Sequence, residues 1–295
     1  MTAFLTTISN FYSYQKERFP VIVLGLSFLP AILSSGAVVI GSVNIEFLTL
    51  SLIISLTYLL HVRIIDEFRD YEHDLEHHKD RPLSVGAITL NDLRIVDWMA
   101  VMALVLAALY SSLQALLIVV VMLGYSFLAR NEFFLGLKFR KHFYLYNAVN
   151  LVQMLLLQVL VYTLANDAFV FTTVVLIHFL FTATGTIIFE FLRKVKSPGR
   201  DGTGQDTYTW FLGIGNALLV YSIFAIVNIL LFAKIMFLSQ DLPSYLVPTA
   251  IALVVGTFST LLFNLFQREE TTNQLMQLSF MVMYGSFNVL IFLAI

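Results

Sequence analysis

The chain has 295 residues, of which 59% are hydrophobic and only 12% are charged, against roughly 45–50% apolar and about 25% charged residues in soluble globular domains. This composition excludes a water-soluble globule, and the formal net charge of -2 gives no basic excess of the kind that indicates a nucleic-acid partner. The absence of cysteine excludes disulfides, thiolate metal sites and cysteine nucleophiles.

Nine long apolar stretches follow one another along the chain. The first, at about 20–43, is too long for the core of a secretory signal and is predicted to be a membrane helix. The others lie at about 45–64, 94–111, 113–129, 143–165, 168–191, 208–237, 244–266 and 273–295. These lengths suit helical crossings of roughly 20 residues, and the stretches lack the alternation of membrane barrel strands. The sequence therefore predicts an all-α integral membrane protein, with nine transmembrane helices in a single domain over 1–295.

The basic residues are segregated by this arrangement. With nine crossings, sixteen of the 17 Lys and Arg residues lie on the side of the N-terminus, and only Lys234 lies opposite. The positive-inside rule then predicts that the N-terminus is cytoplasmic. The longest polar connections, at about 65–93, 130–142 and 193–207, lie on the same side, so the function is expected there.

The second stretch ends in an acidic segment, Asp66-Glu67-Phe68-Arg69-Asp70-Tyr71-Glu72-His73-Asp74. Helical spacing places Asp66, Asp70 and Asp74 on one face, where like charges destabilise a helix by roughly 0.2–0.5 kcal/mol per pair, so a cation is expected beside them. Oxygen-only ligands favour a hard ion such as Mg²⁺, which takes one or two carboxylates and completes its shell with water and phosphate. The simpler alternative is a solvated helix end beyond the membrane.

A bend is predicted just beyond, in Lys79-Asp80-Arg81-Pro82-Leu83-Ser84-Val85-Gly86. Pro82 and Gly86 favour a turn that brings Arg81 next to the acidic face, where its guanidinium can bind a phosphate oxygen. Three histidines, at positions 73, 77 and 78, are a possible transition-metal set. Because the first two lie on a different face from the carboxylates, we interpret the three as polar loop residues.

These motifs resemble the UbiA superfamily of intramembrane prenyltransferases, in which Asn-Asp-x-x-Asp-x-x-x-Asp is followed by Arg-Pro-Leu-x-x-Gly. The chain has Asp66-Glu67-x-x-Asp70-x-x-x-Asp74 and then Arg81-Pro82-Leu83-x-x-Gly86. The resemblance implies helices around a central cavity, and Mg²⁺ bound with a prenyl diphosphate by Asp66, Asp70 and Asp74. Asp66 replaces the family's Asn and Glu67 its first Asp, which leaves the number of metal ions open.

Glu190 lies near the inner end of the sixth stretch, and an acidic residue there is a candidate functional residue by its position alone. In the resembled family a second acidic motif closes this helix. The chain has Lys194 where a second Asp would follow, so Lys194 is predicted to contact diphosphate, and Asp201 and Asp206 to supply the missing ligands. The alternative is that Lys194 and its basic neighbours anchor the helix end at anionic headgroups.

The connection at 130–142 carries basic residues among aromatic ones. Nucleic-acid binding is a generic interpretation of such a mixture, but anchoring at the membrane interface suits it better here. In the resembled family a basic residue of this connection binds diphosphate, for which the candidates are Lys138, Arg140 and Lys141. Gly213-Ile214-Gly215 lacks the rest of a dinucleotide-binding pattern and is predicted to serve helix packing.

The resemblance implies Mg²⁺-dependent transfer of an isoprenoid chain from a prenyl diphosphate to an aromatic or lipid-like acceptor within the membrane. The candidate catalytic residues are Asp66, Asp70, Asp74 and Glu190, with Asp201 and Asp206 as further metal ligands. The candidates for diphosphate binding are Arg81, Lys138, Arg140, Lys141 and Lys194. The alternatives are a membrane terpene cyclase of the same superfamily and a cation transporter. The transporter is disfavoured because coupling sites normally lie near the membrane midplane.

Overall fold

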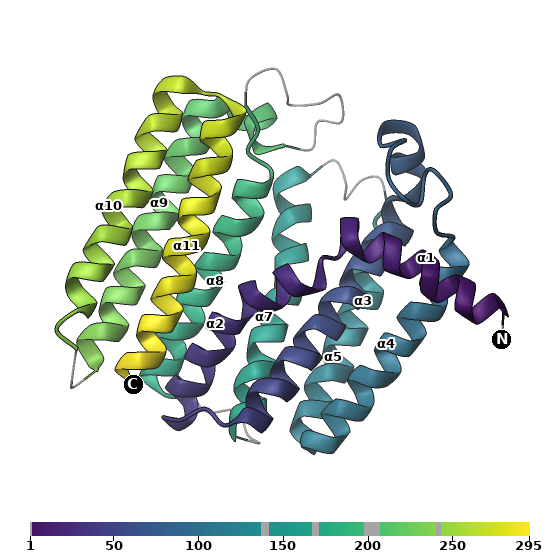
Figure 1. Ribbon diagram of the computed structural model, residues 1–295, viewed down its shortest axis with the longest axis horizontal. Helices are drawn as coiled ribbons and strands as arrows, with labels where there is room; N and C mark the ends of the chain where they lie inside the picture. Colours follow the sequence, from purple (N-terminus) through teal and green to yellow (C-terminus); the bar gives the residue numbers. More distant parts are fainter. Residues whose placement is uncertain (1, 137–141, 167–170, 198–206, 240–242) are drawn as a thin grey trace. The chain divides into compact units, whose positions relative to one another are not determined.

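The computed structural model describes residues 2–136, 142–166, 171–197, 207–239 and 243–295, which form helices and no strands (Figure 1). The α-helices are α1 (Thr2–Arg18), α2 (Val21–Ile40), α3 (Ile45–His77), α4 (Leu90–Ser111), α5 (Leu113–Arg130), α7 (Phe143–Asn166), α8 (Thr173–Arg193), α9 (Tyr208–Leu238), α10 (Leu246–Gln267) and α11 (Glu270–Ala294). Within the described ranges, all of these except α1 are long and apolar enough to cross a membrane. The predicted nine-helix, multi-pass membrane protein is thereby confirmed.

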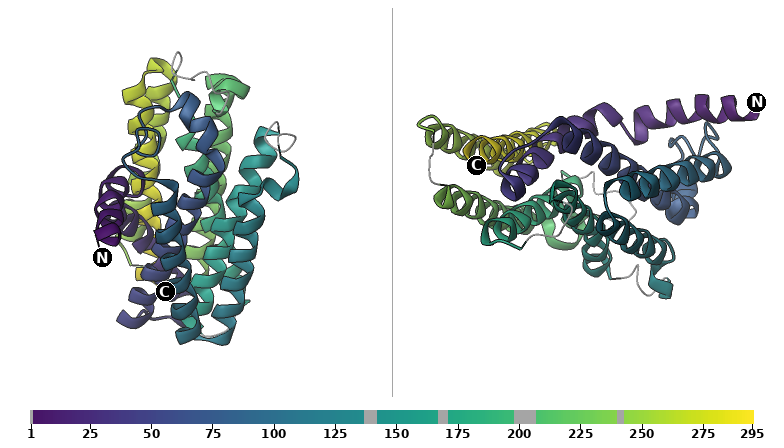
Figure 2. Two further views of the ribbon diagram at one scale, coloured as in Figure 1. Left: turned by 90° about the vertical axis from the view of Figure 1, so that its right-hand side faces the viewer. Right: turned by 90° about the horizontal axis from the view of Figure 1, so that it is seen from below.

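The helices group into two compact units. Unit 1 comprises Met1–Ile32 and Asn44–Phe169, and in it α3 packs against α4, α5 and α7 while α5 packs against α4 and α7. Unit 2 comprises Leu33–Val43 and Val170–Ile295, and in it α8 packs against α9, and α10 against α11. Figure 2 gives two further views of these helices.

Helix α3 is longer than a membrane crossing requires. Its 33 residues extend about 50 Å at 1.5 Å per residue, whereas the hydrocarbon core is about 30 Å thick. Asn44 caps its start by accepting a hydrogen bond from the backbone N–H of Phe47 at 2.7 Å. The helix continues through the acidic segment to His77, so the polar connection expected at about 65–93 becomes irregular only beyond that residue.

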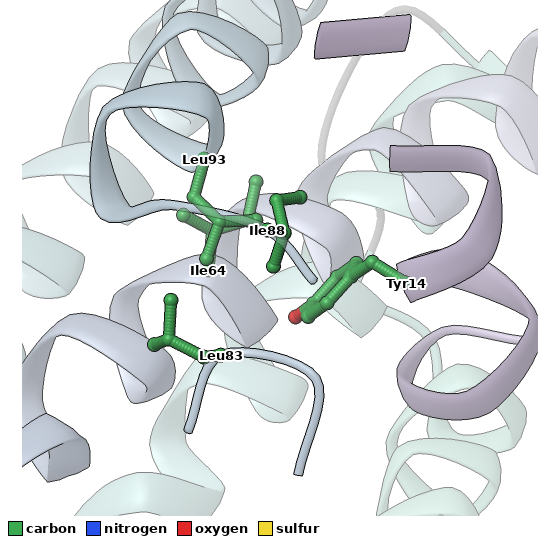
Figure 3. Packing of buried hydrophobic residues seen from close by; sticks show 5 residues of the cluster. All are labelled: Tyr14, Ile64, Leu83, Ile88 and Leu93. Carbon is green, nitrogen blue, oxygen red and sulfur yellow. The ribbon is translucent and has the colours of Figure 1, made fainter. Parts of the chain in front are cut away.

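A helix that the sequence did not predict, α1, precedes the first membrane span. Its Tyr14 is 1% exposed and packs among Ile64 of α3 and Leu83, Ile88 and Leu93 of the following connection and α4 (Figure 3). Because these residues flank the acidic segment and the Arg81 bend, α1 covers the region that carries the predicted chemistry.

Positive φ angles occur inside α9 and directly after α5. Gly213 (φ 72°, ψ 157°) interrupts α9 in a region that is essentially restricted to glycine. A Cβ at Gly213 or Gly215 would meet no described atom within 4 Å, so the predicted packing role is wrong and the first glycine instead permits a break in the helix. After α5, Glu132, Phe133 and Phe134 have φ of 51°, 53° and 58°, each at a cost of about 1–2 kcal/mol.

Candidate active site

The three aspartates of the predicted metal face lie on the last turns of α3. The side chains of Asp66 and Asp70 are 30% and 34% exposed, whereas that of Asp74 is 5% exposed. Asp74 is therefore in a different environment from the other two. Across the described ranges, no group of three His, Asp or Glu side chains is arranged to hold a metal ion.

Asp66 and Asp70 converge on one guanidinium, that of Arg69. Arg69 Nη2 lies 2.7 Å from Asp66 Oδ1 and 3.3 Å from Asp70 Oδ2, and Arg69 Nε lies 3.2 Å from Asp70 Oδ1. The side chain of Arg69 is only 6% exposed. The cation expected beside the acidic face is therefore supplied by the chain itself, in the middle of the acidic motif.

Helix α7 holds Arg69 from a second direction. Arg69 Nη1 donates a hydrogen bond to Asn150 Oδ1 at 3.4 Å, and the guanidinium lies 5.2 Å from the centre of the Tyr146 ring. An arginine above an aromatic face gains electrostatic attraction in addition to its hydrogen bonds. These contacts hold the guanidinium from the side of α7.

Arg81 forms an ion pair with Asp74, and a compact turn brings it there. The turn is closed by hydrogen bonds from Val85 N to Arg81 O at 3.0 Å and from Ala87 N to Pro82 O at 2.8 Å. Gly86 has φ +75°, a conformation that favours glycine. The Arg-Pro-Leu-x-x-Gly segment thus folds back onto the end of α3, as its sequence predicts.

The donor set formed by Asp66 and Asp70 fits a magnesium ion. Both carboxylates lie within 3.3 Å of a single positively charged nitrogen, Arg69 Nη2, which stands where one cation can be shared between them. Mg²⁺ in proteins is commonly held by one or two carboxylates, with water and phosphate as the remaining ligands. Asp74 lies apart from these two carboxylates and forms its ion pair with Arg81.

Glu67, next to the acidic face, has a separate role. It is 2% exposed, and its Oε1 accepts hydrogen bonds from Arg18 Nε at 3.0 Å, from Tyr14 OH at 3.3 Å and from Arg63. Burial, together with the charge of Glu67, raises the pKa of Tyr14 well above its ordinary value, so the phenol stays protonated and donates. This cluster fastens α1 to α3 and leaves Glu67 outside the metal-binding pair.

The histidines lie near one another at the end of α3. The ring centre of His73 lies 4.5 Å from that of His77 and 5.9 Å from that of His78. His73 and His77 lie within α3 and only His78 follows it, so their predicted place in a loop is wrong. That they are polar residues rather than metal ligands stays a prediction.

In unit 2, Glu190 is paired with the first two of the basic residues that follow it. Its Oε1 lies 2.8 Å from Arg193 Nη2 and 3.1 Å from Lys194 Nζ. Helix α11 holds the last turn of α8 and the segment after it: Gln277 donates to Leu192 O at 3.0 Å, and Asn273 donates to Val195 O at 2.9 Å. The cation at position 194 thus has a carboxylate partner on its own helix.

Five predicted site residues, Lys138, Arg140, Lys141, Asp201 and Asp206, lie outside the described residues. The sequence also offered a signal that the prediction did not use. Arg69 is three residues after Asp66 and adjacent to Asp70, and helical neighbours at i and i+3 form ion pairs.

No family model matches the sequence, and no curated protein does. Solved structures do match the fold. A structure of digeranylgeranylglyceryl phosphate synthase has a TM-score of 0.63 and 15% identity, with 99% of this chain and 98% of that one covered. A UbiA homologue from Aeropyrum pernix K1 has a TM-score of 0.63 and 13% identity over 91% of this chain and 98% of that one.

A UbiA homologue from Archaeoglobus fulgidus bound to DMAPP and Mg²⁺ has a TM-score of 0.60 and 16% identity over 95% of this chain and 98% of that one. Identities this low establish the fold alone. The chain has the fold of the UbiA homologues, in agreement with the motif resemblance.

Proposed function

We propose that the chain, which has the UbiA fold, is a member of the UbiA superfamily and transfers an isoprenoid chain from a prenyl diphosphate to an acceptor within the membrane. The observation that carries the proposal is the convergence of Asp66 and Asp70 on a single cationic position at the end of a membrane helix. The Archaeoglobus fulgidus homologue, with the same fold, has been solved with GPP and Mg²⁺. A prenyl diphosphate is the ligand class that uses such a site.

In this proposal Asp66 and Asp70 would hold the magnesium ion, which when bound supplies positive charge that stabilises a leaving diphosphate. Arg81 lies at the same end of α3 and presents a guanidinium suited to paired phosphate oxygens. The electrostatic stabilisation of a leaving group by preorganised cations is a large contribution to catalysis in many enzymes. In this arrangement Asp74 would position Arg81, with which it is paired, and its role as a further metal ligand stays a prediction.

The roles of the remaining candidates rest on the family resemblance. Glu190 is proposed as a second acidic group and Lys194 as a diphosphate contact, together with Asp201 and Asp206 as ligands and a basic residue among Lys138, Arg140 and Lys141. The acceptor is proposed to be aromatic or lipid-like, since it must enter from an apolar environment. If a double bond of the prenyl chain itself were the acceptor, the protein would be a terpene cyclase. The identity of the product distinguishes a cyclase from a prenyltransferase.

Binding of the uncharged and charged forms of one prenyl chain tests this function. A C10 prenyl diphosphate should bind in the presence of Mg²⁺ and much more weakly in EDTA, whereas the corresponding alcohol should be insensitive to Mg²⁺. Lys194→Ala should weaken diphosphate binding selectively by about tenfold or more, because a charge-assisted contact contributes roughly 1.5–3 kcal/mol.

Arg193→Ala is the matched control, because Arg193 also pairs with Glu190 but its side chain is 66% exposed. Equal losses for diphosphate and alcohol would indicate damage to packing. If the wild-type protein bound the diphosphate equally well with Mg²⁺ and in EDTA, the proposed function would be contradicted. If only Arg193→Ala lost affinity for the diphosphate and not for the alcohol, the role of Lys194 would be contradicted.

We also propose that the N-terminus and the acidic end of α3 face the cytoplasm. The chain has no native cysteine, so single-cysteine variants report topology directly. Lys79→Cys and Arg268→Cys should react with a membrane-impermeant thiol reagent only after the cytoplasmic side is opened, and Lys234→Cys should react from outside. Labelling of Lys79→Cys and Arg268→Cys from opposite sides would contradict the nine-span arrangement.

A further inference from the structure

Arg69 is a cation built into the acidic motif, at the position that a metal ion would share between two carboxylates. We propose that Arg69 keeps the metal out of the Asp66–Asp70 pair until a diphosphate binds, so that metal binding is conditional on substrate. This inference rests on the proposed function and adds to it an order of binding and a residue that sets the order.

Arg69 and a metal ion would compete for the same carboxylate oxygens. Asp66 Oδ1 and Asp70 Oδ2 both approach Arg69 Nη2, at 2.7 and 3.3 Å. Mg²⁺ binds its oxygen ligands at about 2.0–2.1 Å, closer than the guanidinium approaches these two oxygens. A metal ion that uses them has to compete with the positive charge of Arg69 for both carboxylates.

Arg69 does not lose all of its contacts when the carboxylates release it. Asn150 and the Tyr146 ring, both on α7, contact it from outside the acidic motif. The guanidinium therefore stays at the site, where a neighbouring anion can take the place of the aspartates. The carboxylates, each about one third exposed, stay accessible to an entering ion.

A diphosphate makes this exchange favourable for two reasons. Its oxygens offer the guanidinium paired acceptors, the geometry that arginine binds best. The same diphosphate completes the coordination shell of a metal held by Asp66 and Asp70. Without diphosphate, Arg69 gains no new acceptors when a metal ion displaces it, and the metal gains no phosphate ligands. The affinity of Asp66 and Asp70 for a metal ion alone is therefore low.

Direct measurement of Mn²⁺ binding to purified protein, by electron paramagnetic resonance of the free ion, tests the inference without any turnover. Arg69→Gln should bind Mn²⁺ about tenfold or more tightly than wild type when no diphosphate is present, because competing charge-assisted contacts are gone. The same variant should bind the C10 prenyl diphosphate more weakly. Opposite shifts for the two ligands distinguish an exchanging cation from a structural one.

Arg130→Gln is the matched control, because Arg130 also lies over an aromatic ring, at 4.6 Å from that of Phe68, at the same end of unit 1. It should leave Mn²⁺ binding unchanged. Arg69→Lys keeps the positive charge but lacks the planar guanidinium. Its Mn²⁺ affinity should lie between those of wild type and Arg69→Gln, a graded result that a folding defect in Arg69→Gln would not produce.

Unchanged or weaker Mn²⁺ binding in folded Arg69→Gln, measured without diphosphate, would overturn the inference. Failure of the wild-type protein to bind the C10 prenyl diphosphate in the presence of Mn²⁺, measured on the diphosphate by equilibrium dialysis, would instead overturn the proposed function. The two failures are therefore separate, since one concerns the difference between variants and the other concerns the wild type alone.

Discussion

Asp70→Asn is expected to lower the rate of prenyl transfer by at least about a hundredfold while the protein stays folded. Loss of an outer-shell partner of a metal ligand already costs about 10–100-fold, and Asp70 is proposed to be a ligand itself. The amide keeps the shape of the side chain but removes the charge. Because Asp70 is about one third exposed and Arg69 retains Asp66 as a partner, the fold should tolerate the change.

Glu72→Gln is the control for this substitution. It makes the same carboxylate-to-amide change two residues further along α3, at an exposed position on the other side of the helix, and should retain wild-type activity. The rate of diphosphate release and the thermal unfolding temperature in detergent are measured for both variants. Equal activity of Asp70→Asn and wild type would contradict the metal-ligand assignment.

Gly185→Ala is expected to produce the largest loss of stability among conservative substitutions in unit 2. A Cβ at this position would lie 2.2 Å from Tyr284 Cε2 and 2.5 Å from Tyr284 Cζ, too close for non-bonded atoms. The ring has little room to move, since it stacks on Phe181 and Phe280 at 5.2 and 5.9 Å. Overpacking of this kind costs about 1–3 kcal/mol, which is measured as a lower unfolding temperature.

Gly256→Ala is the matched control, because a Cβ there would meet no described atom within 4 Å. It should leave the unfolding temperature unchanged or raise it, because alanine is favoured over glycine in a helix by about 1 kcal/mol. Combining Gly185→Ala with Tyr284→Leu should cost less than the sum of the two single changes, because the second removes the clash. Additive losses, or an unaltered unfolding temperature in Gly185→Ala, would show that α8 and α11 do not approach as closely as the structure has them.

The membrane spans could be predicted because hydropathy and charge distribution decide them locally. The acidic face and the bend that carries Arg81 could also be predicted from the sequence, because helical spacing determines the first and the residues Pro82 and Gly86 determine the second. Helix α1 was missed because its position depends on Tyr14 and on the contacts of Arg18 with α3, and neither is evident from an apolar stretch.

The partners of the charged residues were harder to predict. Three aspartates on one face indicated a cation, and the metal was the natural choice, but Arg69 lies within reach of two of them. Which of several neighbouring carboxylates an arginine contacts depends on its rotamer and on α7, through Asn150. The approach of Gly185 to Tyr284 likewise joins residues about a hundred positions apart.

Product formation tests the central claim most directly. Purified protein is incubated with a C10 to C20 series of prenyl diphosphates, Mg²⁺ and a membrane lipid extract, and both inorganic diphosphate and organic products are measured, the latter by mass spectrometry. The proposed function predicts equimolar diphosphate and a prenylated acceptor in wild type, and neither in EDTA or in Asp70→Asn. Transport of a cation by the protein across a membrane, with every prenyl diphosphate left intact, would contradict the proposed function.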